Sequence, residues 1–165
     1  MPLQTAPEDP HPFQLAASST QFLLKRVAVD VGLVLRKHMI VIQEAGQLGG
    51  LVGRSVLVGD HLDGFACSNN MVRVTAKNVA DTGYLFAVLA SEYGVRLVSR
   101  EAAGSSIPHI EAGRVRAISL PWPDEGVRLS IGNLVMEAQR LRDKAVAADR
   151  EARTLVEEAI EKGAS

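Results

Sequence analysis

The chain has 165 residues, a formal net charge of −1 and 47% hydrophobic residues, a composition typical of one folded domain with a real core. A charge this close to zero excludes a protein that binds nucleic acid through overall basicity alone. The single cysteine excludes a framework of internal disulfides and a cysteine-rich zinc site.

No apolar run approaches the roughly 20 residues that span a bilayer, and the first 20 residues lack the basic start and apolar core of a signal peptide. We therefore expect a cytoplasmic protein.

The first half of the chain is predicted to hold a leader and a small β-sheet. Residues 1–19 contain four of the seven prolines and have no periodicity, so they predict an irregular leader. The β-branched and aliphatic segments 32–42, 55–58 and 71–75 are each typical of strands. Residues 46–54, between the first two, hold four glycines and predict a turn whose backbone needs glycine.

The second half begins with a change of period. Apolar residues at helical spacing predict a helix over residues 82–97, with Asp81 or Thr82 as the cap. A loop marked by Gly, Ser and Pro follows at residues 103–110, and residues 116–121 predict a last short strand.

The C-terminal segment carries the clearest pattern in the sequence. Apolar residues recur at alternating steps of four and three, which is the heptad seam of a coiled coil, and they predict one helix over about residues 124–162. At ~1.5 Å per residue such a helix is about 55–60 Å long. A domain of this size cannot bury so long a stripe, so a second long helix is implied. The predicted pairing residues are Val127, Ile131, Leu134, Ala138, Leu141, Ala145, Ala148, Ala152, Leu155 and Ala159.

No residue constellation predicts catalysis, a metal or a cofactor. The four histidines are scattered without a second ligand at metal-site spacing, and Cys67 is expected to be structural. The glycine-rich segment lacks both the Walker ending and the dinucleotide spacing. The chain also has no Ser/His/Asp series and no HExxH motif, so we expect a protein that is not an enzyme.

The order of these segments resembles a known family. A strand precedes a glycine-rich loop, and a Ser-Asn-Asn element opens the next strand. An amphipathic helix, the block GSSIPHI at residues 104–110, the short strand ISLP at residues 118–121 and the long helix follow in turn. Over about residues 32–160, this arrangement resembles the target recognition domain and spacer helix of Type I restriction–modification DNA specificity subunits. The resemblance implies an α+β fold, in which a leader (1–19) and a small mixed β-sheet target recognition domain (20–122) precede one long coiled-coil helix (123–162).

The resemblance also implies a function and a set of partners. Specificity subunits have no catalytic activity; they direct a separate methyltransferase subunit, which brings S-adenosylmethionine, and a separate restriction subunit to double-stranded DNA. They usually carry two recognition domains, whose long helices pair antiparallel. This sequence holds one domain and one helix, so we expect a homodimer or pairing with another specificity half. The loop residues expected to contact DNA are Arg36, Lys37, Gln47, Arg54, Asn69, Asn70 and Arg73.

Two other interpretations remain open at this stage. Each candidate DNA contact is also compatible with a solvated surface side chain, and Asn69 with a turn former. The chain could accordingly be a protein-only assembly or regulatory module, a truncated specificity-subunit remnant that does not bind DNA. A catalytic domain would instead require a pocket in which polar side chains cluster.

Overall fold

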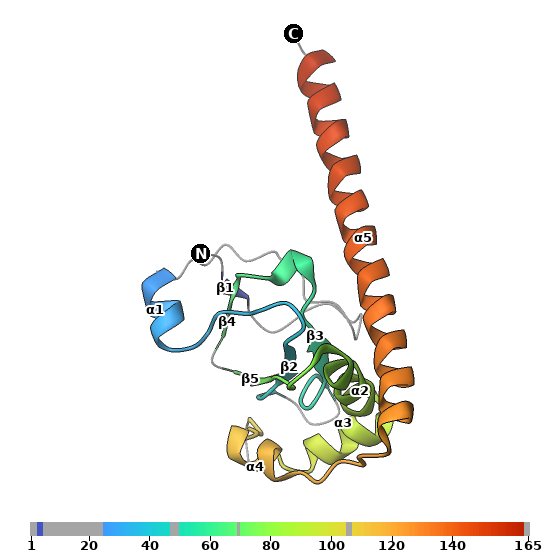
Figure 1. Ribbon diagram of the computed structural model, residues 1–165. Helices are drawn as coiled ribbons and strands as arrows, with labels where there is room; N and C mark the ends of the chain where they lie inside the picture. The colour runs from blue at the N-terminus through green and yellow to red at the C-terminus, as the bar shows by residue number, and fades with distance from the viewer. Residues whose placement is uncertain (1–2, 5–24, 47–49, 69, 105–106, 164–165) are drawn as a thin grey trace.

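The computed structural model describes residues 3–4, 25–46, 50–68, 70–104 and 107–163, and a small antiparallel sheet lies at its centre. The sheet has the order β3-β2-β5 and consists of β2 (Ile40–Gln43), β3 (Ser55–Leu57) and β5 (Met71–Val74). Helices cover one face of this sheet, and a single long helix extends away from it (Figure 1). The α+β class predicted from the sequence is confirmed.

The strand β2 lies between the other two strands, and every residue of it is buried. Its Ile40 pairs with Leu57 on one side and with Val74 on the other. The glycine-rich segment joins β2 to β3, as predicted. Its Gly53 has a φ of +79°, and a Cβ there would lie 2.6 Å from the Ser99 hydroxyl, so only glycine fits.

A second, separate pair of strands departs from the single mixed sheet that was predicted. β1 (Leu3–Gln4) runs parallel to β4 (Ala66–Cys67), and these two strands do not belong to the three-stranded sheet. The remainder of the predicted leader lies outside the described residues. The predicted strand over residues 32–42 is also shorter than expected: α1 (Lys25–Asp30) precedes it, and regular pairing begins only at Ile40.

Hydrophobic residues fill both faces of the three-stranded sheet, because side chains alternate along each strand. On one face, Ile40, Ile42 and Val72 pack with Phe86 and Leu89. On the other face, the core consists of the buried residues Leu33, Leu35, Val41, Val58, Leu62, Cys67 and Met71.

The helix predicted over residues 82–97 is in fact two helices, α2 (Val79–Ala90) and α3 (Glu92–Ser99). Ser91 ends the first and caps the second, since its hydroxyl accepts from the Gly94 N–H at 3.0 Å and donates to the Val88 carbonyl at 2.6 Å. The predicted cap was also wrong, because Asn78 accepts from the Asp81 N–H at 2.7 Å.

The predicted strand over residues 116–121 was wrong as well. The helix α4 (Ala112–Ala117) occupies its beginning, and the residues after it pair with no strand in the described part of the chain. Ile118 and Leu120 nevertheless pack against the core, so their apolar alternation reflects burial without a sheet neighbour.

The long helix α5 (Glu125–Gly163) confirms the prediction of one continuous C-terminal helix. Its first turns pack on α2 with almost no space between the two backbones. A Cβ on Gly132 would lie 2.0 Å from the Ala80 carbonyl oxygen, and one on Gly83 would lie 2.4 Å from the Gly132 carbonyl oxygen. Arg128 completes this contact with an ion pair to Asp81 at 3.1 Å.

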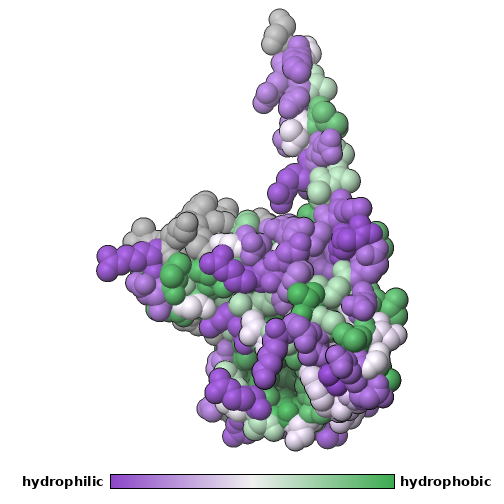
Figure 2. Space-filling model, in the orientation of Figure 1, coloured by the Kyte–Doolittle hydropathy of each residue, from purple (hydrophilic) through white to green (hydrophobic). Residues whose placement is uncertain are grey.

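Farther along α5, a polar cluster marks the end of its contact with the globular part. The Asp143 carboxylate accepts from the Asp60 N–H at 3.1 Å and from the Gln139 amide at 3.0 Å, with His61 Nδ1 3.8 Å away. These residues tie α5 to the short helix η1 (Asp60–Leu62). Beyond residue 146 every described residue of α5 is exposed, and hydrophobic residues line one edge of the projecting helix (Figure 2).

The cap of α2 gives a direct test of this fold. Replacing Asn78 by Ala is expected to lower the free energy of unfolding by about 1 kcal/mol, because the Asp81 N–H loses its acceptor. Urea denaturation followed by circular dichroism measures the change. Asn78→Ser keeps a capping oxygen and is the matched control; a loss equal to that of Asn78→Ala would contradict a capping role.

Candidate nucleic-acid interface

A shallow, basic pocket lies where two chain segments leave the sheet at the same end. Ile40 pairs with Val74, so the residues before β2 and those after β5 emerge side by side. They enclose a pocket of about 220 Å³. Its lining residues are Arg36, Lys37, His38, Met39, Thr75, Ala76, Lys77, Asn78, Val79 and Thr82.

A tight turn presents the cations on the first segment. The Met39 N–H donates to the Arg36 carbonyl at 2.9 Å, and His38 adopts a left-handed φ of +68°. The His38 N–H in turn donates to the Val58 carbonyl at 2.9 Å, which fixes the turn against the chain that follows β3. Arg36 and Lys37 therefore stand exposed on a backbone held by hydrogen bonds.

Lys37 is largely committed to neighbouring carboxylates. Its ammonium forms an ion pair with Asp60, and its backbone N–H donates to Asp63 at 2.8 Å. The hydrogen bond that the Lys37 ammonium donates to Asp60 raises the pKa of Lys37 above its ordinary value, with smaller contributions from the negative charges of Asp60, Asp143 and Asp63. Lys37 is therefore cationic at neutral pH, but its charge is partly neutralised by these carboxylates.

Arg36 and Lys77 provide the uncompensated charge of the pocket. Both are exposed, and neither has an ion-pair partner among the described residues. The N-terminus of α2, capped by Asn78, opens into the same pocket, and the positive end of a helix favours an anion. This arrangement can attract and position a phosphate group.

The structure does not bring the other predicted DNA contacts to this pocket. Arg54 lies at the opposite end of β2, where its Nε donates to the Gly50 carbonyl at 3.0 Å, and Asn70 lies at that same end beside Glu44. Arg73 lies across from Val41 and donates to Cys67 Sγ at 3.3 Å, on the face of the sheet away from Val72 and Val74. Arg36, Lys37, Arg54 and Arg73 therefore do not form one connected face.

Two predicted DNA contacts cannot be located, and two residues of the pocket were not predicted. Gln47 and Asn69 lie outside the described residues. Lys77 and Asn78 also line the pocket, and neither was predicted as a contact. The sequence does carry a signal for this region: Asn78 precedes Asp81 by three residues, a spacing typical of a helix start.

Most of the predicted seam of α5 remains uncovered. The exposed fractions of Leu134, Leu141 and Leu155 are 71%, 53% and 59%. Val127, Ala145, Ala148, Ala152 and Ala159 are also exposed, and only Ile131 and Ala138 are half-buried. The contact with the globular part uses a neighbouring stripe that includes Arg128, Gly132 and Gln139, so the seam is free to pair.

Other kinds of site find little support in the part of the chain that the structure describes. No three His, Cys, Asp or Glu side chains there are grouped closely enough to bind a metal ion. Cys67 is fully buried, as a structural cysteine would be. Of the helices in the described ranges, none combines the length and apolar character needed to cross a membrane.

Comparison with known proteins leaves the family open. Neither the protein-family models nor the curated proteins contain a match to this chain. The similarity to Type I specificity subunits therefore remains a prediction from the order of motifs.

Proposed function

We propose that this chain is the non-catalytic, DNA-recognising half of a Type I restriction–modification specificity subunit. In this proposal a cytoplasmic dimer forms through α5, and it directs methyltransferase and restriction subunits to double-stranded DNA. The observation that carries the proposal is the largely uncovered heptad seam, since a monomer gains nothing from exposing Leu134, Leu141 and Leu155 along one stripe of a helix.

The partner that best fits the seam is a second copy running antiparallel. In an antiparallel pair centred between Ala145 and Ala148, Leu141 faces Ala152 and Leu134 faces Ala159 of the second copy. Leu155 then faces Ala138, so each of these layers combines one large and one small side chain, which allows even packing. The two central layers pair Ala145 with Ala148, so the helices approach closely there. The same seam serves both copies, as a two-fold axis requires.

A parallel pair would pack less well. It would place Leu141 against Leu141 and Ala138 against Ala138, so wide and narrow layers would alternate and the alanine layers would leave voids. Charge does not discriminate between the two directions: Lys144 can approach Asp149 of the second copy in a parallel pair and Glu151 in an antiparallel one. Packing therefore favours the antiparallel arrangement.

The pocket around Arg36 and Lys77 is the proposed phosphate contact. Its cations and the positive end of α2 point to one anion, while the low net charge of the chain requires that other subunits contribute phosphate contacts. Base recognition in this proposal falls to Arg54, Asn70 and other loop side chains at the opposite end of β2.

The DNA contact can be tested with two substitutions. Arg36→Ala and Lys77→Ala are each expected to weaken duplex binding uniformly across sequences and to reduce the salt slope of the binding constant by about 1, because each removes one phosphate contact. Fluorescence anisotropy over a salt series measures this effect. Arg100→Ala removes an exposed arginine outside the pocket and is the control. Salt slopes identical to that of the unaltered chain would contradict a phosphate contact.

A second candidate function is a protein-only assembly module. The pairing of Lys37 with Asp60 and the separation of the basic residues between the two ends of β2 favour it. Dimerisation without any salt-dependent DNA binding, alone or with a Type I methyltransferase subunit, would support this candidate over the first.

A further inference from the structure

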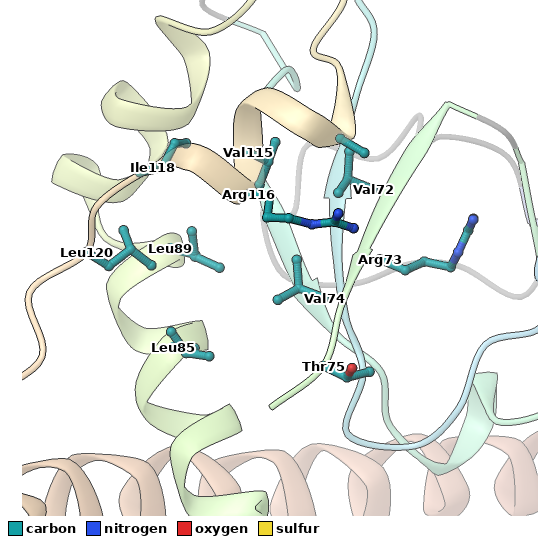
Figure 3. Close-up of a pocket in the computed structure, with 11 residues that line it drawn as sticks. Val72, Arg73, Val74, Thr75, Leu85, Leu89, Val115, Arg116, Ile118 and Leu120 are labelled. Carbon is teal, nitrogen blue, oxygen red and sulfur yellow. The ribbon is translucent and has the colours of Figure 1, made fainter. Parts of the chain in front are cut away.

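A cavity of about 400 Å³ opens where the core beside β5 is incomplete. Its walls come from the face of β5 that carries Val72 and Val74, from Leu85 and Leu89 of α2, and from α4 with the residues that follow it (Figure 3). Figure 2 shows a hollow lined by hydrophobic residues in the lower part of the globular domain. The volume falls within the range of pockets that hold small molecules.

The apolar walls are only partly covered by the protein itself. Val74, Leu85, Val115, Ile118 and Leu120 all pack against the buried core, yet each remains half-exposed. The helix α4, which forms one side of the cavity, contributes no buried residue to the fold. An apolar guest would therefore bury surface that the folded chain leaves in water.

One cation lies at this cavity without a counter-charge. The Arg116 side chain extends from α4 toward β5, whereas Arg73 points away from the cavity (Figure 3). Arg73 is engaged with Cys67 Sγ and the Met71 carbonyl. Arg116 has no hydrogen-bond or ion-pair partner among the residues that the structure describes.

We propose that this cavity binds a small amphipathic monocarboxylate, with an aliphatic body against the valines and leucines and its carboxylate on Arg116. A single uncompensated guanidinium matches a single negative charge, and its planar fork suits a carboxylate. The apolar walls recognise an unbranched chain through burial alone. This site is independent of the proposed DNA contact, because the two pockets share only Thr75.

Isothermal titration with decanoate below its micelle concentration tests the proposal. The chain is expected to bind one decanoate, and each CH₂ removed from the ligand is expected to weaken binding by about fourfold. Decanol and decylamine are expected to bind at least about tenfold more weakly than decanoate, because neither presents an anion to Arg116.

The matched variants are Arg116→Gln and Arg114→Gln. Both change an exposed arginine of α4, but Arg114 faces Glu101 and does not line the cavity. Arg116→Gln is expected to weaken decanoate binding by about tenfold with unchanged thermal stability, and Arg114→Gln to leave it unchanged. Absence of decanoate binding, equal affinity for decanol, or equal loss in the two variants would each overturn the proposal.

Discussion

Replacing Gly132 by Val is expected to be the most destabilising single substitution on α5. The new Cβ would lie 2.0 Å from the Ala80 carbonyl oxygen, and backbone atoms cannot rotate away as a side chain can. The two helices must separate, which also disturbs the ion pair between Arg128 and Asp81. We expect a loss of about 3 kcal/mol in the free energy of unfolding and a fall in Tm of about 10 °C, measured by calorimetry.

Gly126→Val is the matched control for this experiment. Gly126 lies in the first turn of the same helix, where an added Cβ would approach only a side-chain oxygen of Asp124, at 3.3 Å. Its cost is expected to stay below about 1 kcal/mol. Equal losses in the two variants would mean that β-branching in the helix, and not the close contact with α2, accounts for the effect.

Replacing Leu141 by Asp is expected to convert the proposed dimer into a monomer. Leu141 is more than half exposed in the single chain, so the substitution costs the monomer little, but in the proposed dimer it places a carboxylate against Ala152 twice. Losing the burial of two leucines corresponds to about 3–6 kcal/mol, or roughly 10²- to 10⁴-fold in the dimer dissociation constant. Sedimentation equilibrium measures this constant.

Ala147→Asp introduces the same charge six residues farther along α5, at an exposed position off the seam. It is expected to leave the dimer intact, and neither variant is expected to change the Tm of the globular part. A dimer that survives Leu141→Asp, or that Ala147→Asp dissociates equally, would show that the seam is not the interface.

The long helix was the most predictable element because its signal is local and repeated. Ten apolar positions at steps of four and three predicted a helix over residues 124–162, and the structure has it at Glu125–Gly163. The Asp124 carboxylate accepts from the Val127 N–H at 3.0 Å, which agrees with its predicted place at the helix start. The sequence did not reveal the second stripe, because its close contact depends on glycines that carry no hydrophobic signal.

The predictions of secondary structure were wrong where a short apolar segment is compatible with more than one structure. Ile118 and Leu120 alternate as in a strand, yet they pack against the core beside α4 without a sheet partner. The break between α2 and α3 depends on Gly94, whose missing Cβ lets its backbone lie close to the Val88 carbonyl. Such tertiary contacts override local periodicity.

Only part of the basic pocket could be predicted from the sequence. The sequence marked Arg36 and Lys37 as exposed cations, but their grouping with Lys77 follows from the register of β2 with β5. Likewise, the distance of Arg54 from Arg36 follows from their positions at the two ends of β2. The pairing register of β2 with β5 cannot be predicted from the residue pattern of either strand alone.

The central claim, that α5 pairs two copies antiparallel, is tested most directly by a distance between spin labels. Asn133→Cys places a label at an exposed position of α5 off the seam, and the fully buried Cys67 is protected from labelling. In the proposed register Asn133 faces residue 160 of the second copy, so the two labels are separated by roughly 27 residues of helix, or about 40 Å. Pulsed electron paramagnetic resonance is predicted to give this single distance. A distance below about 20 Å, as expected of a parallel pair with axes ~8–10 Å apart, or the absence of any coupling between labels, would contradict the account.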